Sequence, residues 1–359
     1  MTLSNHIQHR PLIRSLTSIL MLSSFAVTVE AHVKWFFPYD VMAPPMPIGE
    51  VLDGAFVRLF LATVAGVYVF FLVDRYTLRK GVLAALDEKL KRFDNVAVYI
   101  MRVSAGIFFL TLFLWWALGM GQSFYLTPEL RTTAIYVPWL HLLMALAVIS
   151  ARTTPITGVG VFLLWFAAAR NYGIFHMLDY PIFLGIGYYL AVSTSRSRVW
   201  LKSGLVVLFA STGITLIWAA VEKFAYPNWT VEVLKERPGM LMGLTPQMFM
   251  KVSGFAEMSL TFILLGAASV VGRLVALGLM SVFVLAIFEF GFVDAVGHLM
   301  IVAILWVLIV RGPTDARNML VLPGKGLFTE AYFMTGLYFL AFGMIFILYY
   351  GIHYLSYGS

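Results

Sequence analysis

Long runs of apolar residues, separated by short polar segments, dominate this chain. Ten such runs follow residue 50, and each approaches the roughly 20 residues that a helix needs to cross the hydrocarbon core of a bilayer. In lipid, only a helix satisfies all its backbone hydrogen bonds within one segment, so the pattern predicts ten transmembrane helices. Their predicted ranges are 54–73, 96–118, 133–150, 155–171, 178–194, 201–221, 247–267, 271–289, 294–310 and 331–350.

Composition agrees with a membrane-embedded fold. Of the 359 residues, 61% are hydrophobic and only 12% are charged, against about 25% charged residues in a soluble domain. We therefore expect an all-α, polytopic membrane bundle whose main partner is the lipid bilayer. The net charge of +7 comes from basic residues in short loops, so it does not indicate a nucleic-acid partner. The chain has no cysteine, which excludes thiolate metal sites, cysteine nucleophiles and disulfides.

Residues 1–31 have the pattern of a secretory signal peptide. Arg10 and Arg14 precede a short apolar stretch, and Ala31 ends a segment suited to cleavage. Cleavage after Ala31 would make His32 the first residue of the mature chain and leave 32–53 as a periplasmic segment. The alternative is an uncleaved first helix.

Loop charges predict the orientation. Basic residues recur in alternate loops, and such loops face the cytoplasm. This places residues 32–53 on the periplasmic side of a bacterial inner membrane, in agreement with the signal peptide. Residues 76–93 look amphipathic, which is typical either of a helix on the inner leaflet or of a solvated loop helix. The basic residues concerned are Arg75, Arg79, Lys80, Lys89, Lys91, Arg92, Arg152, Arg196, Arg198, Lys202, Arg273, Arg311, Arg317 and Lys325.

An internal duplication is indicated by residues 155–194 and 273–312, which match without gaps in hydropathy and glycine placement. Gly173 aligns with Gly291, and His176 aligns with Asp294. Because four helices separate the copies, both have the same orientation, unlike inverted transporter repeats. The predicted units are a first helix with a basic loop (54–95), two parallel four-helix repeats (96–195 and 196–312), and a loop with a last helix (313–359).

Ionisable residues within the predicted spans are the candidates for chemistry. A charge inside a span costs a few kcal/mol and usually faces the bundle interior. Such groups could meet near the periplasmic face and exchange protons with a quinone, or bind a metal. The alternative is a set of ion pairs, for example Lys223 with Glu222 or Glu257. The candidate catalytic residues are Glu222, Glu257, Glu289, Asp294 and His298.

The histidines suggest a candidate copper site. His32, His141, His176, His298 and His353 all fall on the periplasmic side in the predicted topology. A free α-amine and imidazole at His32 could chelate copper together, with His141, His176 or His353 as further ligands. The alternative is that His32 merely opens an ordered outer segment over residues 32–40.

The second repeat resembles the DoxX/DoxD family of small four-helix membrane proteins. The likeness covers about residues 200–311, and the family's quinone-linked redox work implies a quinone as cofactor here, with Lys223, Tyr226 and Trp218 beside it. The motifs that carry it are Trp218, the run from Glu222 to Pro227, Gly254-Phe255-Ala256-Glu257, Gly272-Arg273 and Asp294-x-x-Gly297-His298.

These features lead to a working hypothesis of a quinone-linked redox subunit whose site opens to the periplasm. One rival is a transporter or channel for a small solute or metal ion that uses the same polar groups. A second rival is a non-catalytic assembly subunit that holds a partner redox protein.

Overall fold

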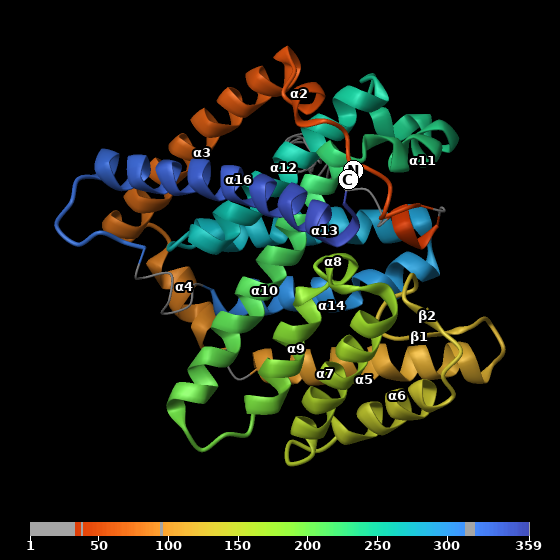
Figure 1. Ribbon diagram of the computed structural model, residues 1–359. Helices are drawn as coiled ribbons and strands as arrows, with labels where there is room; N and C mark the ends of the chain where they lie inside the picture. Colours follow the sequence, from red (N-terminus) through yellow and green to blue (C-terminus); the bar gives the residue numbers. More distant parts are fainter. Residues whose placement is uncertain (1–32, 37–38, 94–95, 313–319, 359) are drawn as a thin grey trace, which may run out of the picture.

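The computed structural model describes residues 33–36, 39–93, 96–312 and 320–358, and its secondary structure is almost entirely helical (Figure 1). The signal-peptide prediction and His32 lie outside these residues. A helix of twelve residues or more overlaps each of the ten predicted ranges. These helices are α3 (Gly54–Lys80), α5 (Val96–Ala117), α6 (Tyr136–Ala147), α7 (Thr154–Tyr172), α9 (Pro181–Val192), α10 (Arg198–Ala225), α12 (Pro246–Gly266), α13 (Val271–Phe290), α14 (Phe292–Arg311) and α16 (Leu327–Tyr357).

Seven of these helices are long and apolar enough to cross a membrane, which confirms a multi-pass membrane protein: α3, α5, α10, α12, α13, α14 and α16. Helices α6 and α9 are apolar but have only 12 residues each. Side chains define several helix ends. Asp53 caps α3 by accepting a hydrogen bond from the Phe56 amide at 2.8 Å, and Thr245 caps α12 in the same way.

Short elements fill the connections between the long helices. A two-stranded antiparallel hairpin lies between α5 and α6, with Ser123 opposite Thr132 and Phe124 opposite Arg131. The short elements are η1 (Val33–Trp35), α2 (Ile48–Val51), α4 (Ala84–Lys91), β1 (Ser123–Phe124), β2 (Arg131–Thr132), α8 (Ile174–Met177), η2 (Pro227–Thr230), α11 (Val231–Glu236) and η3 (Pro238–Leu241).

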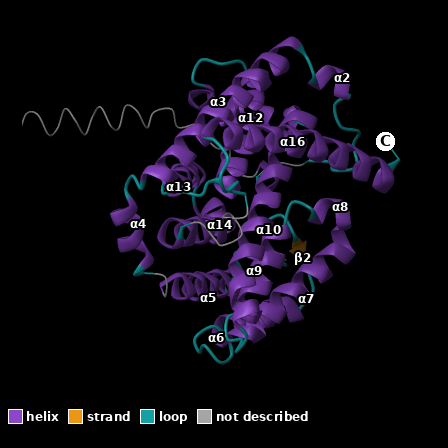
Figure 2. Ribbon diagram, turned by 90° about the vertical axis from the view of Figure 1, so that its left-hand side faces the viewer, coloured by secondary structure: helices purple, strands orange, loops and turns teal. Residues whose placement is uncertain are grey.

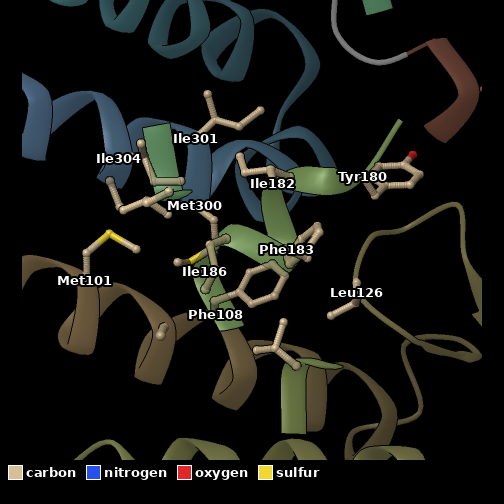
Figure 3. Packing of buried hydrophobic residues seen from close by; sticks show 14 of the residues in the cluster. Met101, Phe108, Leu126, Tyr180, Ile182, Phe183, Ile186, Met300, Ile301 and Ile304 are labelled. Atoms are coloured by element: carbon tan, nitrogen blue, oxygen red, sulfur yellow. The ribbon is translucent and has the colours of Figure 1, made fainter. Parts of the chain in front are cut away.

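Eight of the long helices form a closed arrangement. Each packs against the next in the order α5, α6, α7, α9, α10, α12, α13 and α14, and α14 packs back against α5. Large side chains from both predicted repeats fill the centre, among them Phe108, Ile186 and Ile304 (Figure 3). Helices α3 and α16 pack against each other and against α12, on the side of the molecule away from α6 and α7 (Figure 2).

Hydrogen bonds join helix ends that the predicted topology assigns to the same side. Arg102 of α5 donates to the Val148 carbonyl after α6, at 2.8 Å from Nη2. Arg273 of α13 donates to the Val310 carbonyl of α14 at 2.6 Å. We call this side, which carries the basic loops, the basic end, and the other side the opposite end. The start of α5 thus lies beside the end of α6, and the start of α13 lies beside the end of α14.

A buried ion-pair cluster anchors α3 and α16 at the basic end. Asp74 accepts hydrogen bonds from the Ala268 and Ser269 amides at 3.1 and 3.0 Å, and so caps the turn before α13. It also pairs with Arg75, which is fully buried. Glu330 at the start of α16 lies 3.7 Å from the Arg75 Nε. Arg75 thus lies between two carboxylates, and Arg79, which is 3.1 Å from Glu330, supplies the second positive charge.

The two halves share a backbone feature that the predicted duplication aligns. Gly173 ends α7 with φ +85°, and Gly291 ends α13 with φ +79°. Both are in the left-handed region that glycine adopts without strain. The halves then differ, because α14 continues unbroken where the first half has α8, a turn at Leu178–Tyr180, and α9. The duplication itself stays a prediction.

The amphipathic segment 76–93 is divided between two helices. α3 continues to Lys80, Gly81 turns with φ +62°, and α4 follows. Asp87 of α4 binds the Arg273 guanidinium at 2.7 Å. The segment is therefore tied to the bundle through α4, while Leu86 remains exposed.

Candidate functional site

The N-terminal segment enters the bundle at the opposite end and places two side chains inside it. In η1, Trp35 packs its ring against the His298 ring, with centroids 4.9 Å apart. Gly297 allows this approach, because a Cβ there would overlap the Trp35 ring. The helix α14 therefore carries a glycine where the indole lies. The same insertion turns Lys34 toward α8, α9 and α10.

Lys34 is a buried cation held between two carboxylates. Its Nζ lies 2.7 Å from Glu222 Oε1 of α10, and it also pairs with Asp179, which lies in the turn between α8 and α9. The three side chains are almost completely buried, at 2%, 1% and 8% exposure for Lys34, Asp179 and Glu222. Lys34 also lies over the Trp229 ring, at 5.1 Å from its centroid.

Beside this triad lies a second polar cluster centred on Glu129, from the loop between β1 and β2. Its carboxylate accepts a hydrogen bond from the Tyr39 hydroxyl at 2.8 Å and another from Tyr180. It also pairs with His176 Nε2, which is 3.1 Å from the Tyr39 hydroxyl. The cluster thus combines one carboxylate, one imidazole and two phenols, which are groups able to hold and pass protons.

Both clusters border a cavity of about 600 Å³, which we call the N-terminal cavity. One wall of this cavity is formed by Asn171, Tyr172 and His176, and another wall is formed by the N-terminal segment. Its lining residues are Lys34, Trp35, Phe36, Tyr39, Asp40, Val41, Met42, Glu129, Arg131, Asn171, Tyr172, Gly173, His176 and Tyr357. Asp179 and Glu222 do not line it, so Lys34 connects the cavity to these two buried carboxylates.

The electrostatics fix the protonation of two groups. Burial opposes the charge on Lys34, but Asp179, Glu222 and Glu129 outweigh it and hold the pKa of the ammonium above its ordinary value of 10.5. Burial, followed by the charge of Glu129, raises the pKa of the Tyr39 hydroxyl well above its ordinary value of 10.0. At neutral pH Lys34 is therefore charged, and Tyr39 is a hydrogen-bond donor to the carboxylate.

The five predicted catalytic residues fall into four separate groups. Glu222 belongs to the Lys34 triad. Glu257 pairs with Lys223 at 2.9 Å, which is one of the ion pairs that the sequence left open. Glu289 binds Arg237, with half of its side chain exposed. Asp294 accepts a hydrogen bond from His298 Nδ1 at 2.9 Å, four residues along α14.

The residues predicted to contact a quinone do not line the N-terminal cavity. Trp218 packs in an apolar cluster, with its ring 4.7 Å from that of Tyr349. Lys223 binds Glu257, as described above. Tyr226 donates to the Ala43 carbonyl at 2.8 Å and stacks on Trp229, with ring centroids 4.0 Å apart. Tyr226 therefore holds the N-terminal segment through a hydrogen bond and holds Trp229 through ring stacking.

The three predicted metal ligands that the structure describes have separate partners. His141 bonds the Tyr125 carbonyl at 3.0 Å, His176 binds Glu129, and His353 bonds the Val41 carbonyl at 3.1 Å. Within the described residues there is no group of three or more His, Asp or Glu side chains arranged to hold a metal ion. The copper hypothesis thus rests on His32, which lies outside them.

Three residues at the centre of the site did not stand out in the sequence: Lys34, Tyr39 and Glu129. A lysine directly before the aromatic run from Trp35 to Tyr39 is the signal that could have indicated Lys34, since such a segment is buried only if its charge is paired. Glu129 lies in a loop, so no periodic pattern identifies it. His176 did stand out, as a candidate metal ligand, and it binds Glu129 instead.

Comparisons with family models, with curated proteins and with solved structures find no match for this chain. Function is therefore inferred from the residues and the geometry of the site.

Proposed function

We propose that this chain is a ten-span inner-membrane redox subunit, built on two DoxX-like four-helix repeats, whose N-terminal cavity binds a quinone head group on the periplasmic side. The observation that carries the proposal is the Glu129 cluster at the wall of the cavity. A quinone head group presents two oxygens, each of which needs a hydrogen-bond partner and gains or loses a proton with the redox change.

The cluster has the groups that this chemistry requires. Reduction of a quinone takes up two electrons and two protons, and oxidation of the quinol releases both. His176, Glu129 and Tyr39 would exchange the protons at the cavity wall, and Lys34 would hold the two carboxylates behind it in place. The electrons would come from, or pass to, a partner redox protein at the same face of the membrane.

The cavity also has a suitable shape and lining. Its volume of about 600 Å³ lies within the range of small-molecule sites in proteins. Aromatic rings of Phe36, Tyr39, Tyr172 and Tyr357 line it, and they offer flat apolar contacts for a planar ring.

The first rival, transport of a small solute, receives less support from the interior. A path across the membrane needs a continuous polar lining, whereas the centre of the closed arrangement is filled with apolar side chains such as Phe108, Ile186 and Ile304. The second rival, an assembly subunit, gives no reason for a carboxylate, an imidazole and two phenols beside a cavity.

The test is quinone binding by the full chain in mild detergent, titrated with a short-chain ubiquinone and followed by quenching of tryptophan fluorescence. Replacing a good polar contact costs about 1–3 kcal/mol, so His176→Ala and Glu129→Gln should each weaken binding by about tenfold or more. Glu289→Gln is the matched control, because it removes an exposed carboxylate at the same end.

Binding that is unchanged in both site variants would overturn the proposal. Flux of a solute into proteoliposomes without any electron acceptor would favour transport instead. A stable redox partner that co-purifies with a chain unable to bind quinone would favour the assembly subunit.

A further inference from the structure

A second cavity lies at the basic end, far along the helices from the N-terminal cavity. It has a volume of about 440 Å³ and is bounded by α5, α9, α10, the last residue of α14 and the loop after α6. We call it the arginine cavity. Its lining residues are Ala97, Val98, Tyr99, Arg102, Ala151, Tyr189, Val192, Ser193, Leu201, Leu205 and Arg311.

The lining has a distinctive charge. It contains two arginines and no acidic residue, whereas the N-terminal cavity contains Asp40 and Glu129 beside its basic residues. Two guanidinium groups around one space favour an anion with several oxygens, because each guanidinium presents a fork of N–H donors.

The fold fixes Arg102 in this position. Its Nε and Nη2 donate to the Val148 carbonyl at 3.0 and 2.8 Å, and Nη2 also donates to the Ile149 carbonyl at 2.5 Å, which holds the side chain at the end of α6. Among the described residues, its Nη1 has no hydrogen-bond partner. An arginine that is oriented by three hydrogen bonds and retains a donor is preorganised for a ligand.

The remaining walls are apolar and open toward lipid. Leu205 is buried, while Tyr99 and Leu201 are 61% and 41% exposed on the outer surface of the bundle. A ligand that fits both parts has an anionic head and an apolar tail. Basic pockets between helix ends on the cytoplasmic side of a membrane recognise anionic lipid head groups in this way.

We propose that the arginine cavity binds the phosphate group of an anionic phospholipid, with Arg102 and Arg311 contacting the phosphate and Leu201 and Leu205 contacting the acyl chain. A free phosphate ion shares the head-group chemistry but lacks the tail. The site is independent of the quinone proposal, because no residue lines both cavities.

The experiment measures bound lipid per chain by native mass spectrometry, with the full protein in mild detergent supplied with phosphatidylglycerol, with phosphatidylcholine, or with inorganic phosphate. We expect retention of phosphatidylglycerol over phosphatidylcholine. Removal of one basic charge near lipid weakens attraction by about fivefold, so Arg311→Gln should lose the lipid to that degree.

Two further variants make the result specific. Ala151→Trp keeps both arginines but fills the space, and it should also lose the lipid. Arg152→Gln is the control, since Arg152 lies in the same loop and is exposed outside the cavity. Equal retention in all three variants, or equal retention of both lipids, would overturn the proposal. Displacement of the lipid by an equimolar amount of inorganic phosphate would overturn the lipid as the natural ligand.

Discussion

Lys34 has an unusual balance of charges for a residue so deeply buried. One ammonium faces Asp179 and Glu222, and Glu129 lies close enough to act on it. Removing the cation leaves two carboxylates in a space from which water is excluded, which costs far more than the loss of one hydrogen bond. The residue therefore stabilises the fold around the cavity and also sets the charge of the site.

We expect Lys34→Met to lower the free energy of unfolding by about 3–5 kcal/mol, the usual cost of removing one partner of a buried ion pair. The control is Lys251→Met, which removes the partner of Asp53, a carboxylate with 47% of its side chain exposed. An exposed pair contributes about 0–1 kcal/mol. Thermal unfolding in detergent compares the two, and similar small losses would contradict the burial argument.

The pH dependence of the Lys34 contribution follows from its raised pKa. A basic group whose pKa is higher in the folded state stabilises fully below its unfolded value of 10.5 and loses this effect as the pH rises further. The stability difference between the wild type and Lys34→Met should therefore persist at about pH 8 and shrink by about pH 11. Unfolding midpoints across this range give the answer. A difference that already disappears near neutral pH would mean that Lys34 is not charged.

At the scale of elements, the contact between η1 and α14 decides where the N-terminal segment lies. Trp35 is 6% exposed and packs against His298, whose ring also lies 4.9 Å from that of Phe283. Gly297 provides the space for the indole. Burial of a tryptophan contributes strongly to such a contact, so this short segment holds its place without long secondary structure.

We expect Gly297→Ala to destabilise the protein by about 1–3 kcal/mol, because overpacking forces the Trp35 ring and η1 to shift. Gly278 is the matched control: it also lies inside a long helix, α13, but a Cβ there meets nothing within 4 Å. Gly278→Ala should be neutral or stabilise by roughly 0.5–1 kcal/mol, since alanine favours a helix.

The two glycine variants should also differ in the site. Displacement of η1 moves Lys34, so Gly297→Ala should expose the N-terminal segment to trypsin while Gly278→Ala leaves it protected. Equal protection in both variants would show that the segment is held independently of Trp35.

At the scale of the whole molecule, the sequence predicted the helices well because their signal is local. Each apolar run lies on a helix, and the Asp294–His298 spacing correctly placed two side chains on one face. It was harder to predict that Glu222, Glu257 and Glu289 do not lie together. Those residues lie on three different helices, and each side chain contacts a different partner.

The N-terminal cluster could not be predicted for a related reason. Lys34, Glu129 and Asp179 come from an inserted segment, a hairpin loop and a turn, and none of these has a repeating pattern. The contacts of Lys34 span 145 and 188 residues of chain, and those of Glu129 span 47 to 90 residues, so only the packing of the helices brings these side chains together. The partners of Lys34 follow from the tertiary fold rather than from spacing.

The number of crossings has a consequence for both ends of the chain. With ten spans, the N-terminal segment and the end of α16 lie on one side of the membrane. If only the seven long apolar helices cross, α6, α7 and α9 stay on one side, and the two ends lie on opposite sides. The hydrogen bond between His353 Nε2 and the Val41 carbonyl requires the two ends to be close, which favours ten spans.

Because the chain contains no cysteine, single cysteines can report the topology without a modified background. Met42, Ser197 and Ser356 are exposed and lie in the N-terminal segment, before α10, and near the end of α16. With ten spans, an impermeant maleimide added to intact spheroplasts should label Met42→Cys and Ser356→Cys but reach Ser197→Cys only after permeabilisation. With seven spans, Met42→Cys and Ser197→Cys would share one side and Ser356→Cys would lie on the other. The two arrangements pair Met42→Cys with different partners, so the comparison holds whichever side the N-terminal segment occupies. Labelling of the second kind would contradict the ten-span topology and with it the ion pair between Lys34 and Glu222, which lies near the end of α10.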